Sequence, residues 1–206
     1  MQPLKYKAVN WQDGMKISRE HLIQQESYFV ESIRDASSSQ INSLNYGLLS
    51  MGNSSGKSLN VKITVDPAKI IRVHLLECHA INTNGERIEI TDGKLTADLD
   101  FGDSKEKTFY VTISVNLFAR IASGTPSPSE EPARLPYCEP SYRLEILPES
   151  QLSQRENALL IIGKLNTSDG RLRVVDEYIP PSSAVKNYPL LLSRIMASFN
   201  KRNPSL

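Results

Sequence analysis

The 206-residue chain is 39% hydrophobic and 23% charged, which is the balance of an ordinary globular protein with a core of its own. Its 24 basic and 23 acidic side chains nearly cancel, so no net field favours nucleic acid or an anionic membrane as a partner. The first ten residues lack the apolar core of a secretory signal, and no stretch approaches the ~20 apolar residues that cross a bilayer, so we expect a cytoplasmic protein.

The N-terminal part, residues 1–44, is expected to be an arm followed by an amphipathic helix. Ser18 is a suitable N-cap for a helix that runs to about residue 36, and Leu22, Phe29 and Ile33 fall on one of its faces. Polar and charged side chains occupy the opposite face. We therefore expect a half-buried helix with its apolar face turned inward.

The stretch that leads into this helix has two interpretations. Residues 10–17 bring the only tryptophan, Trp11, together with Gly14 and Met15. Trp11 and Met15 are either an apolar plug over one end of the protein or anchors that dock into a partner, because aromatic side chains bury a large area at low entropic cost. Periodicity alone does not separate these two interpretations.

Beyond residue 45 the apolar period changes to two, which is typical of strands with one buried face. Turn signals such as Asn84-Gly85 and Asp92-Gly93 separate the strands, and no helix-length spacer lies between them. We therefore expect a mainly β protein with an antiparallel sandwich or barrel over residues 45–181. The predicted strands are 59–65, one that starts at residue 71, 87–91, 95–99, 108–118, 142–147, 158–165 and 172–175.

Residues 121–140 hold five of the twelve prolines together with serine, glycine and glutamate, which predicts a long extended loop between two strands. The loop is either a mobile hairpin tip or an ordered arm that binds a partner.

A C-terminal helix is predicted within residues 182–206. Pro189 suits its first turn, and a helical stripe of apolar residues follows: Leu191, Leu192, Ile195, Met196 and Phe199. This stripe either folds back over the sandwich or faces other copies of the chain.

Two catalytic motifs occur between residues 52 and 58. Residues 52–56 fit the G-x-S-x-G elbow that would make Ser54 a nucleophile, and residues 56–58 read like the end of a phosphate-binding loop. Both motifs must open a helix, whereas this stretch leads into a strand, and the glycine spacing of the phosphate-binding loop is one residue short. A flexible turn is therefore predicted, with no catalytic residue.

The histidines and cysteines do not predict a metal or cofactor site. His74 and Cys78 share one face of a strand while His79 points to the other, so the three cannot meet at one ion without a bulge. Cys78 and Cys138 form no C-x-x-C pair, and we expect reduced thiols; a disulfide is the alternative that a cytoplasmic location disfavours.

Several blocks of the sequence follow a known family pattern in order. The pattern W-x-E-G-M-F-L-x-P-Q-H-F-Q-x-Q-D-R-Y is echoed by Trp11, Asp13, Gly14, Met15, Ile17, His21, Gln24, Gln25, Glu26 and Tyr28. Further matching blocks stand at residues 45–49, 84–86, 158–165 and 169–181. The chain thus resembles the TssK family, the baseplate subunit of bacterial type VI secretion systems.

This resemblance implies an N-terminal arm and helix attached to a β-sandwich shoulder domain, similar to the shoulder of phage receptor-binding proteins. It also implies a homotrimer that docks onto the baseplate wedge proteins, with no enzymatic activity and no cofactor. Because the sequence ends at Leu206, we expect the helical neck and C-terminal head of the family to be missing, so contact with the membrane complex is not implied.

The resemblance assigns roles to particular residues. We expect partner binding by the arm and helix, with trimer contacts in a C-terminal helix that begins the neck. The expected partner-binding residues are Trp11, Gly14, Met15, His21, Gln25 and Tyr28, and the expected trimer contacts are Leu191, Leu192, Ile195 and Phe199. Trp11 and Met15 would be the buried anchors, Gly14 the bend, and His21 and Gln25 the polar contacts that fix the register.

Two other functions compete with this prediction. One is a β-sandwich recognition module, such as a carbohydrate-binding or phage receptor-binding domain, which would need an aromatic platform on its strands. The other is a hydrolase that uses Ser54.

Overall fold

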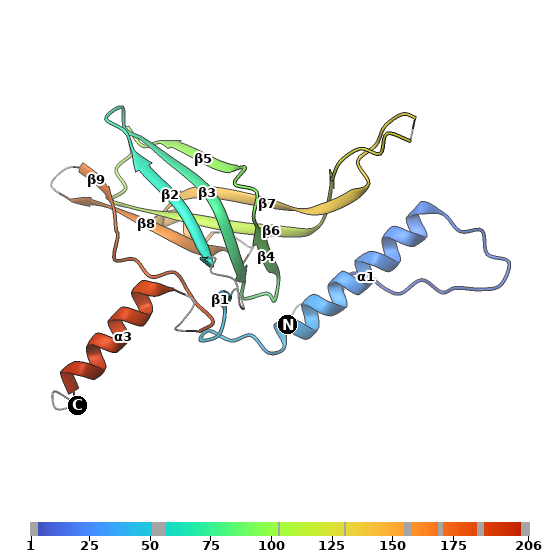
Figure 1. Cartoon of the computed structure of the whole chain (residues 1–206), viewed down its shortest axis with the longest axis horizontal. Coiled ribbons are helices and arrows are strands. Elements are labelled where there is room, and N and C mark those ends of the chain that lie inside the picture. The colour runs from blue at the N-terminus through green and yellow to red at the C-terminus, as the bar shows by residue number, and fades with distance from the viewer. Residues whose placement is uncertain are drawn as a thin grey trace.

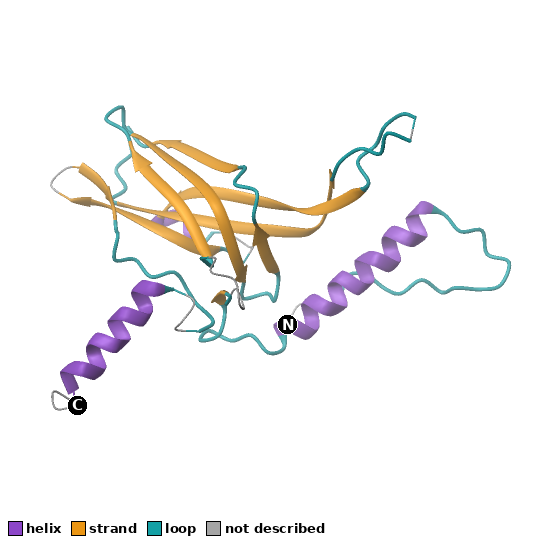
Figure 2. Ribbon diagram, viewed as in Figure 1, coloured by secondary structure: helices purple, strands orange, loops and turns teal. Residues whose placement is uncertain are grey.

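The protein is a sandwich of two antiparallel β-sheets that follows helix α1 and precedes helix α3 (Figures 1 and 2). The computed structural model describes residues 4–50, 57–102, 104–129, 131–154, 158–168, 171–184 and 188–202, with the backbone alone at residues 168, 189 and 199–202. The helices are α1 (Arg19–Ser38), α2 (Glu149–Leu152) and α3 (Pro189–Arg202). The strands are β1 (Gly47–Leu48), β2 (Leu59–Val65), β3 (Ile70–Ile81), β4 (Arg87–Ile90), β5 (Leu95–Asp100), β6 (Thr108–Ser123), β7 (Tyr137–Pro148), β8 (Leu160–Ser168) and β9 (Arg171–Val174).

Strand β3 is the centre of the first sheet, because its 12 residues are long enough to carry two neighbours along each edge. β1 and β2 pair with one edge, and β4 and β5 pair with the other. In the second sheet the described strands follow the order β7-β6-β8-β9. Each of these pairs is antiparallel, as the short connections between the predicted strands indicate.

The hydrophobic core lies between the two sheets and is filled by alternate residues of their strands. Ile71, Val73 and Leu75 of β3 and Val111 and Ile113 of β6 are all fully buried. Burying one such side chain stabilises the fold by roughly 1.5–3 kcal/mol. The mainly β, antiparallel class is confirmed, and each predicted strand overlaps a strand of the structure.

The β6–β7 hairpin reaches further into the proline-rich segment than the sequence predicted. Residues 121–123 pair with residues 137–139, so the loop spans 124–136 and the prediction of a loop over 121–140 is wrong at both ends. The ladder shifts register just before these pairs, and Pro140 lies opposite that bulge. A residue without an N–H removes no ladder bond there, which is why a proline is tolerated inside a strand.

Strand β1, which the sequence analysis did not predict, connects the beginning of the chain segment that forms the sandwich to the end of that segment. The Leu48 N–H donates to the carbonyl oxygen of Pro181 at 2.8 Å. Gly47 has a φ of +105°, and a Cβ on it would lie 2.0 Å from that same oxygen. Only glycine fits this close approach. Two of the sequence blocks that resemble TssK, 45–49 and 169–181, therefore meet here.

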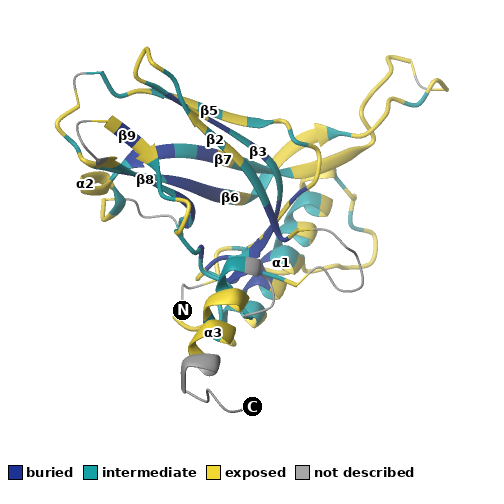
Figure 3. Ribbon diagram, turned by 60° about the vertical axis from the view of Figure 1, so that its left-hand side comes forward, coloured by how far each residue is buried: buried dark blue, intermediate teal, exposed yellow. Residues whose placement is uncertain are grey.

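Both long helices stand away from the sheets. Figures 1 and 3 show α3 pointing away from the sandwich at the C-terminal end, and Figure 1 shows α1 running below the β6–β7 hairpin. Both begin where the sequence predicted, α1 after the N-cap Ser18 and α3 at Pro189. Among the described residues, neither helix has the length and apolar content that crossing a bilayer requires.

Candidate functional site

Residues 4–17 form an extended N-terminal arm that doubles back along α1 (Figure 1). The chain reverses in a turn where the Met15 N–H donates to the Gln12 carbonyl oxygen at 3.2 Å. Gly14 occupies this turn with a φ of +74°, and no described atom beyond its neighbours lies within 4 Å of a Cβ built on it. The backbone conformation, and not a lack of space, therefore requires glycine here.

Side chains of α1 satisfy the backbone of the arm. The carboxylate of Glu31 accepts from the Tyr6 N–H at 2.6 Å, and the amide oxygen of Gln25 accepts from the Val9 N–H at 3.1 Å. The side-chain amide of Gln24 donates to the Lys7 carbonyl oxygen at 3.1 Å. An extended segment outside a sheet needs such partners for its polar groups, and the polar face of the helix supplies them.

The buried Glu31 carboxylate remains charged at neutral pH. Burial alone would raise its pKa, but the backbone N–H groups of Lys5 and Tyr6 and the charges of Arg34 and Lys5 outweigh burial, so the pKa is lowered from its ordinary value of 4.5. Arg34 is also buried, and its guanidinium lies 3.8 Å from the carboxylate. The Glu31 carboxylate, paired with Arg34, therefore holds the arm at Lys5 and Tyr6.

The first turn of α1 is closed by a reciprocal cap. The Ser18 hydroxyl accepts from the His21 backbone N–H at 3.4 Å, and His21 Nδ1 accepts from the Ser18 backbone N–H at 3.2 Å. The ring of Trp11 packs edge-on against that of His21, with 6.2 Å between the centroids. The capping histidine thereby also orients the tryptophan of the arm.

Three contacts attach the arm and α1 to the sandwich. The rings of Tyr6 and Phe118 stack with centroids 4.8 Å apart, and Arg120 forms an ion pair with Glu26 at 2.6 Å. Both Phe118 and Arg120 lie in the bulged part of β6. At the other end of α1, the turn at Gly85 packs so tightly that a Cβ there would lie 2.5 Å from the Ser38 backbone nitrogen.

These contacts turn α1 the opposite way from the sequence prediction. The apolar stripe is exposed, with Leu22, Phe29 and Ile33 at 57%, 56% and 68%, whereas Glu31 and Arg34 are buried. The prediction of an inward apolar face is therefore wrong. The arm explains this orientation of α1. The polar face of the helix supplies hydrogen-bond partners to the backbone of the arm, so that face lies inward and the apolar face points outward.

The residues predicted to bind a partner gather on this arm and helix, in two groups. Trp11 is 46% exposed on the loop at the far end of α1, and Met15 and Gly14 belong to the same loop. His21 and Gln25 are engaged within the chain, where they cap the helix and hold the arm. Tyr28 is half-buried, and its ring contacts that of Phe29 at 5.7 Å between centroids.

Solved structures share the fold that carries this site. A crystal structure of TssK matches with a TM-score of 0.57 at 18% identity, over 96% of this chain and 49% of the TssK chain. The chain has a TssK-like fold. The baseplate complex from the type VI secretion system matches at 0.58, with 15% identity over 96% of this chain and 66% of that one.

A third match is the TssK–TssF–TssG baseplate subcomplex, with a TM-score of 0.54 and 13% identity over 94% of this chain and 68% of that one. The chain therefore spans between about half and two thirds of the structures it matches. No protein-family model matches the sequence, and no curated protein matches it significantly. The TssK-like fold that the sequence blocks predicted is confirmed by structure.

In this TssK-like fold, α3 presents a second exposed apolar stripe. Leu192 and Met196, one helical turn apart, are 43% and 55% exposed, and Leu191 and Ile195 are partly buried. Arg194 forms an exposed ion pair at 3.1 Å with Glu177, which follows β9. The side chain of Phe199 lies outside the described residues.

The sequence motifs that suggested chemistry have structural roles or fall outside the described part of the chain. Ser54 and the two glycines of the G-x-S-x-G stretch lie outside the described residues. The Ser58 hydroxyl donates to the Leu49 carbonyl oxygen at 2.6 Å, and burial raises the pKa of the Cys78 thiol to about 12. His74 donates from Nε2 to the Gly93 carbonyl oxygen at 2.5 Å. No three of the described histidine, cysteine or acidic residues are grouped as ligands of one metal ion.

The sequence analysis did not identify Leu22, Phe29 and Ile33 as site residues. Their spacing was read correctly as a helical stripe, but such a stripe carries no mark of whether it faces a core or a partner. The signal that could have found them is the polar face, because Gln24, Gln25 and Glu31 are all able to bond an extended backbone.

Proposed function

We propose that the protein is a structural adaptor of a type VI secretion baseplate and that its arm and α1 dock onto the wedge proteins of that baseplate. The observation that carries this proposal is the inverted helix, with Leu22, Phe29 and Ile33 exposed on one face. Exposing large apolar side chains to water is unfavourable, and several of them on one helical face make that face a candidate interaction surface.

The choice of partner is supported by the complexes in which the matching TssK-like structures occur. The matching structures include a baseplate complex and a subcomplex that joins TssK to TssF and TssG. We therefore propose TssF-like and TssG-like wedge proteins as the partners, with a structural and non-enzymatic role in the cytoplasm.

The exposed stripe and the tip of the arm supply the anchors in this proposal. Trp11, which is 46% exposed, and Ile17, which is 63% exposed, extend the apolar surface of α1 beyond its first turn. Buried aromatic anchors dominate the binding free energy of many interfaces. His21 and Gln25 act indirectly, because they position Trp11 and the arm.

We further propose that α3 begins a trimer contact, because its exposed Leu192 and Met196 have no cover within the described part of the chain. A helix with one apolar face is stable in water when that face packs against other helices. Leu191, Leu192, Ile195 and Phe199 are the proposed contacts. A carbohydrate-binding module is less well supported, since the only tryptophan lies on the arm and not on a strand.

The proposal is tested by co-expressing the chain with the wedge proteins and measuring co-purification. In Phe29→Ser/Ile33→Ser the apolar stripe is lost, so we expect the wedge proteins to be lost while the thermal unfolding temperature stays within a few degrees of wild type. Leu44→Ser is the matched control, since Leu44 is 86% exposed and follows the helix. Retention of the wedge proteins by the stripe variant would end the docking proposal.

A further inference from the structure

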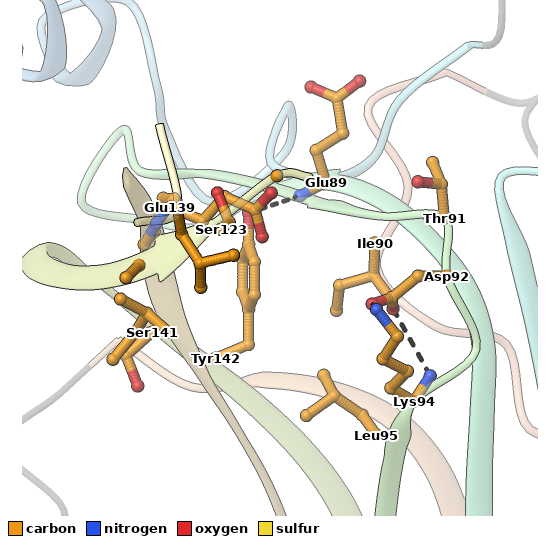
Figure 4. A pocket seen from close by; sticks show the side chains of 15 residues that line it. Glu89, Ile90, Thr91, Asp92, Lys94, Leu95, Ser123, Glu139, Ser141 and Tyr142 are labelled. Atoms are coloured by element: carbon orange, nitrogen blue, oxygen red, sulfur yellow. Dashed lines mark hydrogen bonds and ion pairs between the residues drawn. The ribbon is translucent and has the colours of Figure 1, made fainter. Parts of the chain in front are cut away.

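A cleft of about 900 Å³ lies between the β4–β5 connection and the β6–β7 hairpin (Figure 4). One wall is formed by residues 89–92, 94 and 95, and the other by residues 121–124, 135 and 139–142. The walls are joined at one end, where the Tyr142 hydroxyl oxygen accepts from the Glu89 backbone N–H at 3.4 Å. The cleft is therefore built by two segments that are distant in the sequence and fixed by the fold.

The charge of the cleft is unbalanced. Glu89, Asp92 and Glu139 line it together with Lys94. Glu89 forms an ion pair at 3.0 Å with Arg87, which does not line the cleft. Lys94 already forms an ion pair with Asp92 at 3.0 Å. Glu139 is exposed and forms no ion pair with any residue that the structure describes. A ligand that carries positive charge would restore the balance.

The same cleft has apolar and hydrogen-bonding parts. Ile121 and Leu135, which also line it, are 53% and 41% exposed. The Oγ atom of Ser123 is buried and has no hydrogen-bond partner among the described residues. The exposed Ile121 and Leu135 are therefore the side chains of this wall that a ligand can cover.

We propose that this cleft binds an extended basic segment of a partner protein, with a lysine or arginine against Glu139 and apolar side chains over Ile121 and Leu135. The occupant is a peptide and not a metal ion, because no three described acidic residues are grouped as ligands of one ion. The Glu139 carboxylate, in a cleft that is also lined by the exposed Ile121 and Leu135, fits an extended chain that alternates basic and apolar residues. This surface is separate from the apolar stripe of α1 and does not depend on the proposed function.

The test uses the full chain and a fluorescent ten-residue peptide in which lysine alternates with valine and threonine. We expect saturable binding by fluorescence anisotropy, with no binding of the matching peptide that has glutamate in place of lysine. Amide resonances of Lys94 and Gly124, which belong to the two sides of the cleft, should shift on binding. Shifts confined to other parts of the protein would overturn the proposal.

Two variants and a control distinguish binding of the peptide in this cleft from nonspecific electrostatic binding to the protein surface. Glu139→Lys should weaken binding about tenfold, because an attraction becomes a repulsion, and Leu135→Ser should weaken it severalfold. Asp98→Lys makes the same change of charge at an exposed position of β5 outside the cleft and should leave binding unchanged. Equal weakening by the two lysine variants would refute the proposal, as would displacement of the peptide by spermidine at equal concentration.

Discussion

The carboxylate of Glu31 in α1 accepts a hydrogen bond from the backbone N–H of Tyr6, with 2.6 Å between the oxygen and the nitrogen. This bond joins the arm to the middle of the helix, and the backbone N–H and charge of Lys5 act on the same buried carboxylate. The direction in which α1 faces therefore depends on whether the arm is docked.

Glu31→Gln should loosen the arm without unfolding the sandwich. The amide oxygen is a weaker acceptor than the carboxylate, and hydrogen bonds to charged groups contribute about 1.5–3 kcal/mol. We expect faster tryptic cleavage after Lys5 and Lys7, measured by mass spectrometry. Asp35→Asn removes the same charge one helical turn further along and should leave the cleavage rate unchanged; equal acceleration in both variants would contradict the role of Glu31.

Docking of the arm should also weaken in acid. The pKa of Glu31 is lowered in the folded protein, so Glu31 binds fewer protons when the arm is docked than when the arm is free. The stabilisation is complete above the ordinary value of 4.5 and is lost as the pH falls below it through the lowered pKa. Hydrogen exchange of the Tyr6 amide, measured as opening free energy from pH 7 to pH 3, should show this loss in wild type and a flat profile in Glu31→Gln.

The strands could be predicted from the sequence because their signal is local. Alternation of apolar residues decides which face of a strand is buried, and the core residues Ile71, Val73 and Leu75 follow it directly. The end of β6 and the start of β7, which pair near the tip of the hairpin, were missed because the proline content of that segment outweighed its alternation. Gly47 was missed as a structural position, since its need for glycine comes from Pro181, far along the chain.

Which face of α1 lies against the rest of the protein could not be predicted, because residues outside the helix decide it. The amphipathic pattern is the same for a helix that covers a core and for one whose polar face holds an arm. Which of the two occurs depends on the contacts of Tyr6 with Phe118 and Glu31. The cleft at Glu139 is also non-local, since its walls come from the β4–β5 connection and the β6–β7 hairpin.

Gly85→Ala should destabilise the protein more than Gly93→Ala. Both glycines have positive φ, +77° and +63°, so an alanine costs roughly 1–2 kcal/mol at either position. At Gly85 the added Cβ also meets the backbone of α1 at 2.5 Å, whereas at Gly93 it meets only a leucine side chain at 3.3 Å. The difference in unfolding free energy, measured in urea, reports the packing of α1 on the turn. Equal losses would mean that α1 moves away at no cost.

Trp11→Ala should lower the affinity for the wedge proteins by about 2 kcal/mol or more, which is roughly thirtyfold. The free protein should keep its stability within about 0.5 kcal/mol, because the ring is 46% exposed and contacts His21 only edge-on. Calorimetry and thermal unfolding measure the two quantities. Tyr137→Ala removes an aromatic ring that is 69% exposed on β7 and should change neither. Lost stability with intact affinity would make Trp11 a core residue.

Charge on the apolar stripe of α3 should prevent trimer formation. Leu192→Asp/Ile195→Asp places two carboxylates where the proposed helix–helix contact needs apolar side chains, and an unpaired charge in such a contact costs several kcal/mol. We expect wild type to reach the mass of three chains by light scattering as concentration rises, and the variant to stay at one. Ser193→Asp/Ala197→Asp adds the same charge to the opposite, exposed side of the helix and should still assemble. A trimer in the first variant, or a wild type that never exceeds one chain, would exclude α3 as the contact, and assembly would then have to involve another surface.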